Sequence, residues 1–342
     1  MIIPDNVNFE HYAQQQADAE SGLIKSPTHW FDEVSNLLFN QSGPQGDKLP
    51  WSKTHNLVRL RPGELTLWAG MNGHKKSMLL GQIMAWLARS RKIAIASLEM
   101  KPAKTLERMC RQTSSEEMSG DHFVEFMAFT NSHICIYDQL DKVQANRIIG
   151  FVYYSAVILG CYHIVIDSLT KCGISPKDSE AEKNFIDRLQ WIAKSLGCHI
   201  HLVCHVRKPQ SAGEEYKPTK FDVRGAGEIV DLCDNLFIVW ADKRKTELIE
   251  KQHQRALDAK EQDYISHNPD QLLICAKQRD GEYEGAFGLW FHSRSLQFMQ
   301  SKHETMDLEL THFHAQDDGE EAGMKFLTKQ PSVEDTKDET IQ

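Results

Sequence analysis

The stretch from Leu65 to Gln82, LTLWAGMNGHKKSMLLGQ, combines residue types that bind phosphate. An apolar, strand-like run breaks into a glycine-containing loop and continues as a helical pattern, in the order of the template G-x-x-x-x-G-K-[ST]. In such a loop, backbone N–H groups surround the phosphates, the lysine reaches the β and γ oxygens, and the hydroxyl holds Mg²⁺. The loop residues expected to contact ATP or another NTP are Gly70, Asn72, Gly73, His74, Lys75, Lys76 and Ser77.

Lys75 departs from this template, because it stands where the second glycine is expected. A side chain at that position must leave a crowded loop without blocking the phosphates. The motif by itself is therefore also compatible with an ordinary strand-to-helix turn, or with a P-loop scaffold that does not hydrolyse nucleotide.

Three more polar residues each come at the end of an apolar run. Glu99 lies near the end of IAIASLEM, and a carboxylate there can polarise the water that attacks a γ-phosphate, although an exposed loop acid is an equal alternative. Asp167 ends HIVID, the arrangement of a Walker B acid that holds Mg²⁺. His205 follows CHIHLVC and is expected to sense the γ-phosphate.

The same segment raises the alternative of a metal site, because imidazole and thiol groups ligate metals. Alternation along a strand puts His199 and His201 on one face of a sheet that should be buried, and the sequence holds no second ligand cluster. The sequence therefore argues against a metal site made by these histidines.

Two groups of cations follow. The loop from residue 207 to 224 can position a nucleic-acid backbone without reading its sequence, although Glu214 and Glu215 leave a solvated loop as an equal alternative. Lys277 and Arg279 lie two apart near a strand end and suit the charge on a transferring phosphoryl group, although by themselves they are more typical of solvated cations. The candidate DNA-binding residues are Arg207, Lys208, Lys217, Lys220 and Arg224.

Short β-rich runs alternate with helical segments from Leu49 to Phe298, which predicts an α/β domain with a largely parallel sheet. Ligands of such sheets lie at the carboxyl ends of the strands. The residues predicted at these ends are Gly70, Glu99, Asp167, His205 and Lys277. The predicted strands are Glu64–Ala69, Lys92–Ser97, Ile134–Tyr137, His163–Ile166, His199–Val203, Asn235–Val239 and Leu272–Ala276.

Composition divides the 342 residues into three parts. Residues 1–46 hold a short amphipathic helix and a linker, 47–300 the α/β domain, and 301–342 a mostly disordered tail. The tail contains 11 acidic and 4 basic residues and so carries most of the net charge of −9. Eight cysteines without a C-x-x-C pair and an N-terminus without a signal peptide predict a cytoplasmic protein. The apolar run 148–166 is expected to be a helix, a turn at Gly160 and a strand, not a membrane span.

The order of the segments LWAGMNGHKKS, SLEM, VIDSL, CHVRKP, RGAGE and KQRDGEYEG resembles the RecA-like helicase domain of the DnaB-like replicative DNA helicases, in the style of phage primase-helicases and Twinkle. The resemblance covers residues 49–298. It implies a RecA-like P-loop NTPase core and an NTP-driven, hexameric, ring-shaped DNA helicase that moves 5′ to 3′ on single-stranded DNA. It also implies that Lys277 and Arg279 act on the nucleotide of a neighbouring subunit.

The resemblance extends to partners and cofactors. ATP or another NTP and Mg²⁺ are expected, in the cytoplasm of a bacterium or a phage-infected cell. A primase, polymerase or single-strand binding protein would be a separate chain, for which the acidic tail is a candidate contact. The main alternative is a RecA/RadA-like recombination ATPase that forms filaments on single-stranded DNA; the SLEM and KQR segments argue against it.

Overall fold

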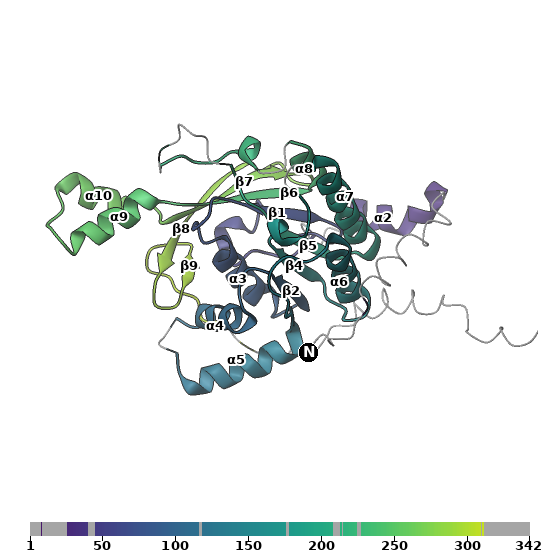
Figure 1. The fold of residues 1–342 in the computed structure, drawn as a ribbon, viewed down its shortest axis with the longest axis horizontal. Helices are drawn as coiled ribbons and strands as arrows, with labels where there is room; N and C mark the ends of the chain where they lie inside the picture. The colour runs from purple at the N-terminus through teal and green to yellow at the C-terminus, as the bar shows by residue number, and fades with distance from the viewer. Residues whose placement is uncertain are drawn as a thin grey trace, which may run out of the picture. The chain divides into compact units, whose positions relative to one another are not determined.

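The computed structural model describes residues 8, 26–39, 45–115, 118–175, 178–207, 213, 215–223, 227–308 and 310. In this part of the chain, nine strands form one sheet in the order β3-β2-β4-β5-β1-β6-β7-β8-β9 (Figure 1). The strands are β1 (Leu65–Ala69), β2 (Ile93–Ser97), β3 (Ile134–Tyr137), β4 (His163–Asp167), β5 (His199–Val203), β6 (Asn235–Ala241), β7 (Gln271–Gln278), β8 (Gly285–His292) and β9 (Gln297–Met299).

The first six strands are parallel, and β7, β8 and β9 extend the sheet in antiparallel fashion. The predicted α/β class with a largely parallel sheet is confirmed. All seven predicted strands exist, and β3 and β5 have the predicted bounds. The sequence analysis missed β8 and β9, and it did not predict that β7 reverses direction, which moves the end of that strand to the other edge of the sheet.

Helices cover both faces of the sheet. One face packs against α6 (Ala145–Val157), α7 (Ser179–Leu196) and α8 (Gly227–Leu232), and the other against α3 (Lys76–Leu87), α4 (Pro102–Gln112) and α5 (Gly120–His133). The described helices also include α2 (Phe31–Phe39), α9 (Lys243–Gln252) and α10 (Ala259–His267). The sheet therefore separates two apolar cores. Because helices cover both faces, polar functional groups can be accessible at the ends of the strands.

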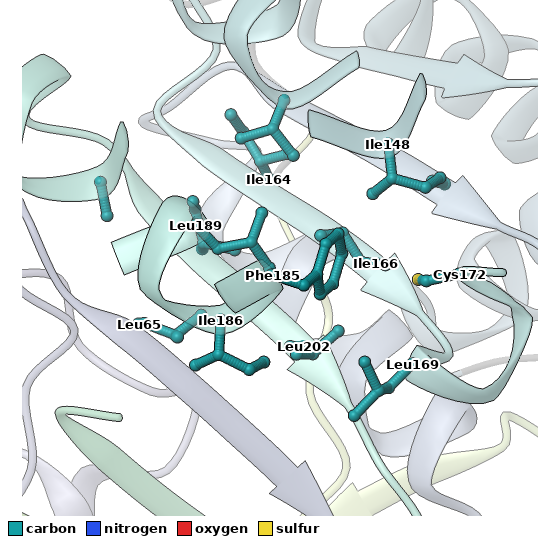
Figure 2. Close-up of a cluster of buried hydrophobic side chains, with 14 of the residues drawn as sticks. Leu65, Ile148, Ile164, Ile166, Leu169, Cys172, Phe185, Ile186, Leu189 and Leu202 are labelled. Atoms are coloured by element: carbon teal, nitrogen blue, oxygen red, sulfur yellow. The ribbon is translucent and has the colours of Figure 1, made fainter. Parts of the chain in front are cut away.

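Helix α7 shows how the sequence builds one of these layers. The Asp178 side chain accepts a hydrogen bond from the N–H of Ala181 and so caps the helix start, and Gly197 ends the helix in the left-handed conformation. Phe185, Ile186 and Leu189 recur at helical spacing and are buried. Figure 2 shows these three side chains packed over the apolar residues of β4 and β5.

The apolar run 148–166 divides as predicted. Helix α6 ends at Val157, Gly160 turns the chain with a φ of +63°, and β4 begins at His163. In the described residues, no helix is both long enough and apolar enough to cross a membrane.

Core packing continues past the boundary predicted at residue 300. Leu308 and Leu310 are buried in the same core as β9. Asp307 accepts hydrogen bonds from the backbone N–H and the hydroxyl of Ser115, each of 2.6 Å. The described residues from 301 to 310 therefore belong to the α/β domain; residues 311–342, where most of the predicted acidic tail falls, lie outside the described part.

A chain of buried hydrogen bonds crosses β1, β5 and β4. The indole N–H of Trp68 donates to His201 Nδ1 (3.1 Å), so Nε2 of His201 carries its proton and donates to His163 Nδ1 (3.0 Å). His163 Nε2 then donates to Asp47 Oδ2 (3.1 Å). Because an indole can only donate, the direction of every bond in this chain is fixed.

His199 lies beside this series of hydrogen bonds, and both of its ring nitrogens also have hydrogen-bond partners. Its Nδ1 donates to the Arg61 carbonyl (2.7 Å), and its Nε2 accepts from the Thr66 hydroxyl (2.8 Å). All six ring nitrogens of His163, His199 and His201 thus have partners, and all three rings are neutral. These contacts give His199 and His201 a structural role in the core. In the described part of the chain, no three His, Cys, Asp or Glu side chains are grouped to hold a metal ion.

We expect the fold to lose stability steeply in acid. Burial lowers the pKa of His199 to about 3, that of His201 well below its usual value, and that of His163 as well. Below the ordinary histidine pKa of about 6.5, the unfolded chain binds up to three protons that the native chain does not, so stability should fall by up to about 4 kcal/mol per pH unit. The charged groups facing the cluster are Asp47, Arg61, Glu64 and Arg91.

Urea denaturation between pH 7 and pH 5 measures this slope. His201→Gln should remove about one third of it, whereas His267→Gln, at a ring that is 76% exposed, should leave it unchanged. Burial raises the pKa of Glu64, so this carboxylate takes up its proton at a higher pH in the native chain than in the unfolded chain and offsets part of the loss. A wild-type protein with equal stability at pH 7 and pH 5 would contradict the assignment of three neutral rings.

Candidate active site

The parallel strands bring the predicted catalytic residues to one edge of the sheet. Glu99 follows β2, Asp167 ends β4, His205 follows β5, and the loop of residues 70–77 follows β1. Since β2, β4, β5 and β1 are neighbours in the sheet, these groups lie in a row across its carboxyl edge. A cavity of about 870 Å³ and a smaller one of about 500 Å³ open here and share Asn72 and His205 in their walls. Their size suits a small-molecule ligand.

The loop after β1 has the backbone that close approach to a phosphate requires. A Cβ on Gly70 would lie 2.5 Å from the Val239 carbonyl oxygen, so only glycine fits there. The buried Lys76 opens α3, and its Nζ donates to the carbonyls of Gly70 (2.9 Å) and Met71 (3.0 Å). These bonds fix the ammonium at the mouth of the loop, where it can reach phosphate oxygens.

Lys75 adopts the conformation that its position in the template demands. Its φ of 60° and ψ of 26° are left-handed, where a non-glycine residue is strained by about 1 kcal/mol. The side chain leaves the loop toward β8, and its ammonium lies 3.3 Å from the ring centroid of Phe291. A cation over an aromatic face at this distance stabilises by about 1–2 kcal/mol. The contact explains how a lysine replaces the expected glycine without filling the loop.

Lys75→Gly is therefore expected to keep or raise nucleotide hydrolysis, because it relaxes the loop and removes no group that faces the cavity. Lys75→Ala is the matched control, since it also loses the Phe291 contact but keeps the strain, and it should be less stable than the glycine variant by about 1 kcal/mol. Steady-state hydrolysis and thermal unfolding measure the two effects. Inactivation by Lys75→Gly would reveal a phosphate contact made by Lys75.

Ser77 and Asp167 form a pair of oxygen ligands that fits Mg²⁺. Asp167 is 8% exposed and accepts a hydrogen bond from the Ser77 side chain. Burial raises the pKa of Asp167 to about 6, so the carboxylate lacks compensating charge in the free protein. Carboxylate and hydroxyl oxygens are ligands that Mg²⁺ accepts, and these two could hold the ion beside nucleotide phosphates.

Glu99 is held by neighbours that the sequence analysis missed. Its Oε1 accepts hydrogen bonds from the hydroxyls of Ser168 (2.5 Å) and Thr170 (3.3 Å). His205 and the Ser168 hydroxyl lower the pKa of Glu99 to about 2, so the carboxylate is ionised at neutral pH. Hydroxyls one and three residues after Asp167, on the turn that follows β4, are the sequence signal that could have indicated this contact.

His205 links Glu99 to Lys76. Its Nδ1 lies 3.4 Å from Lys76 Nζ, which can only donate, and its Nε2 lies 3.7 Å from Glu99 Oε1. Nδ1 is therefore the acceptor, and the protonated Nε2 faces the carboxylate. A group that contacts both the phosphate-side cation and the carboxylate could respond to a γ-phosphate; the sensor role of His205 stays a prediction.

The insertion after β6 also contributes to the site. Between β6 and β7, α9 and α10 form a helical hairpin. Its first turn lines the larger cavity with Lys243 and Thr246. Lys243 Nζ donates to the Gly73 carbonyl (3.3 Å), which ties the hairpin to the phosphate loop. The position of Lys243 just beyond a strand end is the signal that could have found it.

His74 ties the phosphate loop to the sheet. Its Nδ1 accepts a hydrogen bond from the backbone N–H of Ala241 (2.9 Å), and Gln271 Nε2 donates to the His74 carbonyl (3.0 Å). These bonds join the loop to β6 and β7. His74 therefore positions the loop, and a direct nucleotide contact by this residue stays a prediction.

Lys277 and Arg279 lie at the opposite edge of the sheet, which corrects the predicted place of Lys277 among the groups at the carboxyl ends of the strands. The antiparallel β7 pairs Gln271 with Ala241 and Gln278 with Asn235, so its end lies beside the start of β6. Lys277 Nζ donates to the carbonyls of Val230, Asp231 and Cys233 at the end of α8. Arg279 is 42% exposed and pairs with Asp234 at 3.3 Å. Neither cation can reach the nucleotide site of its own chain in this conformation.

The described part of the basic loop presents its cations to solvent. Arg207, Lys217 and Lys220 are exposed, and Val206 and Val223 form a bridge that closes the base of the loop. Lys208 and Arg224 lie outside the described residues.

Comparisons with known proteins agree with this architecture. Residues 52–211 match a family model described as an AAA domain. The chain is 27% identical over 198 residues, 52% of its length, to a DNA helicase/primase of Enterobacteria phage T3, and covers 35% of that protein. It is 23% identical over 233 residues, 61% of its length, to the chloroplastic/mitochondrial Twinkle homolog protein of Arabidopsis thaliana, and covers 32% of that protein. The chain thus spans about one third of the length of these curated relatives.

Solved structures show the same fold. A DnaB-like replicative helicase, solved to describe its interactions with primase, superimposes with a TM-score of 0.62 at 15% identity, over 84% of this chain and 69% of the other. A second solved chain, described as an ATPase domain, superimposes with a TM-score of 0.63 at 16% identity, over 81% of this chain and 99% of that domain. The fold is thus the RecA-like α/β fold of helicase ATPase domains. The resemblance to the DnaB-like helicase family, which the sequence motifs predict, is confirmed by these matches together.

Proposed function

We propose that the chain is the motor of a DNA helicase, which hydrolyses ATP or another NTP and translocates 5′ to 3′ on single-stranded DNA as a ring of six copies. The name of one sequence relative, a DNA helicase/primase, supports the activity. The protein would act in the cytoplasm. A primase, polymerase or single-strand binding protein would act with it, with the acidic tail as a candidate contact.

One observation supports head-to-tail assembly of several copies. The phosphate loop, Asp167 and Glu99 lie at one edge of the sheet, whereas Arg279 lies at the other. A phosphoryl-transfer site that needs an arginine to stabilise transition-state charge is therefore incomplete in a single chain. A neighbouring copy that docks head to tail supplies that arginine, and repetition of such a contact closes a ring or extends a filament.

The chain's own groups divide the work of hydrolysis. Lys76 binds the β- and γ-phosphates, and Glu99 orients the attacking water and takes its proton. Ser77 and Asp167 would hold Mg²⁺, which would supply positive charge beside the phosphate oxygens. His205, in contact with both Lys76 and Glu99, transmits the presence of the γ-phosphate to the loop that begins at Arg207.

Unwinding of two forked duplexes tests the proposal. A fork with a 5′ single-stranded tail should be unwound in the presence of NTP and Mg²⁺, a fork with only a 3′ tail should not, and Lys76→Ala should unwind neither. Negative-stain images with nucleotide separate the alternative: filaments instead of rings, with no unwinding of either fork, would favour a recombination ATPase.

The loop lysines should contribute to DNA binding through charge alone. Lys217→Ala with Lys220→Ala should weaken binding to every single-stranded sequence and reduce the salt slope, log K against log [salt], by about 1.4, because each lost phosphate contact removes about 0.7. Lys260→Ala with Lys302→Ala removes the same charge elsewhere on the surface and should leave the slope unchanged. Equal salt slopes for the two double variants would show that the loop lysines are solvated and do not contact DNA.

A further inference from the structure

The short 3-10 turn η4 (Lys220–Asp222) holds an aromatic side chain out in solvent. Phe221 is 86% exposed, more than any other large apolar side chain of the described residues. Single exposed apolar residues are common and need no explanation by themselves. What distinguishes Phe221 is how rigidly its turn is built and which groups surround it.

Hydrogen bonds converge on Asp222 and fix the turn. Its Oδ2 accepts from the Thr219 N–H (2.7 Å), the Thr219 hydroxyl (2.9 Å) and the Tyr216 hydroxyl (2.7 Å). Its carbonyl accepts from the Arg207 N–H (2.7 Å), so the two sides of the loop are joined. Tyr216 is itself anchored, because its carbonyl accepts the indole N–H of Trp240 in β6 (2.9 Å). The ring of Phe221 is therefore presented on a supported turn, which lowers the entropy lost when a ligand stacks on it.

Exposed lysines lie on the same described segment as the ring. Lys220 Nζ lies 6.0 Å from the centroid of the Phe221 ring, and Lys217 Nζ lies 5.0 Å from the centroid of the Trp240 ring. Glu215 does not cancel this charge, because it pairs with Arg244 at 3.3 Å. A contact with another protein would favour an apolar patch around the ring. An exposed π-face with a lysine beside it, on a segment that carries a second exposed lysine, matches single-stranded nucleic acid, whose bases stack and whose phosphates are anionic.

We propose that Phe221 is a base-stacking residue for single-stranded DNA, and that Lys217 and Lys220 hold the phosphates beside the stacked base. This inference rests on the proposed function and adds a contact of another kind to it. The sequence predicts that the basic loop contacts only the phosphate backbone of the DNA. Abasic DNA has the same backbone and would bind to such a loop equally well. Stacking on Phe221 requires a base, and every base has a face that can stack.

Fluorescence anisotropy with a single-stranded oligonucleotide, and with an abasic oligonucleotide of the same length, isolates this contact. Phe221→Ala should weaken binding to the normal oligonucleotide by about 5- to 150-fold, the measured range for the loss of one base–aromatic stack. Phe221→Trp should bind as tightly as the wild type, whereas Phe221→Leu, apolar but without a π-face, should resemble the alanine variant. On abasic DNA the wild type and Phe221→Ala should bind equally.

Phe221→Ala should also keep the wild-type salt slope, unlike the double lysine variant, because it removes no charge. Four results would overturn the inference: equal affinity of wild type and Phe221→Ala for normal DNA, an equal loss on abasic DNA, a Phe221→Ala slope as low as that of the lysine variant, or a change in oligomeric state. If the wild type binds no single-stranded DNA at any salt concentration, the proposed function fails as well, and the two failures are thereby distinguished.

Discussion

Glu99→Gln is expected to lower the rate of NTP hydrolysis by about 10²- to 10⁴-fold, the usual effect of removing a general base. The amide keeps the size of the carboxylate and can still accept the Ser168 hydroxyl bond, but it cannot take a proton from water. Nucleotide affinity should stay at the wild-type value. Steady-state hydrolysis and titration with a fluorescent nucleotide analogue measure the two quantities separately.

Glu125→Gln, at an exposed position on α5, is the matched control and should leave both quantities unchanged. A Glu99→Gln protein that loses affinity as strongly as rate would assign Glu99 to the structure of the site. The low pKa of Glu99 also implies that its carboxylate stays ionised down to about pH 2 in the free protein, so titration of Glu99 should not limit the rate between pH 5 and pH 8.

Mixing two inactive variants should restore hydrolysis. Arg279→Ala removes the cation that the proposal assigns to the neighbouring site, and Lys76→Ala removes the phosphate-binding cation of the chain's own site. Each protein alone should be slower than the wild type by about 10³-fold or more. In rings mixed at equal amounts, about one interface in four joins an intact loop to an intact arginine, so recovery should approach one quarter of the wild-type rate if interfaces act independently.

Subunit exchange must be verified, for example by fluorescence transfer between labelled copies. Arg279→Lys keeps the charge and tests whether the planar, two-pronged guanidinium matters. Lys277→Ala is a poorer choice, because Lys277 caps the end of α8 through three carbonyls and its loss would destabilise the helix. If exchanged mixtures hydrolyse no faster than their separate components, Arg279 does not act between subunits.

Much of the site follows from the sequence because parallel strands impose a rule. A polar residue directly after a buried strand must appear at the same sheet edge as its counterparts, and this places Glu99, Asp167 and His205 beside the phosphate loop. The same rule, applied to Lys277, gives the wrong edge. Nothing in the composition of β7 distinguishes a parallel from an antiparallel strand, since direction depends on the connection through α9 and α10.

Other features depend on tertiary contacts that no local pattern encodes. The Lys75 ammonium makes its cation–π contact with the ring of Phe291, which lies more than two hundred residues further along the chain. Strand β9 is three residues long, and its glutamine Gln297 is buried by bonds to the segment after α4 rather than by any apolar periodicity. The predicted roles of the loop cations stay predictions, and Lys208 and Arg224 fall outside the described residues.

The candidate nucleotide site and Arg279 lie at opposite edges of one sheet. Each chain therefore presents two different surfaces for contact with other copies. Under the proposed assembly, the nucleotide site of a free monomer lacks an arginine, and its own Arg279 has no nucleotide to contact. In a closed ring, every nucleotide site receives the arginine of a neighbouring copy. The rate per chain should therefore fall on dilution, with a midpoint at the dissociation constant of the subunit contact. Monomers would then bind nucleotide without hydrolysing it, and each new contact between copies would make one site active in hydrolysis.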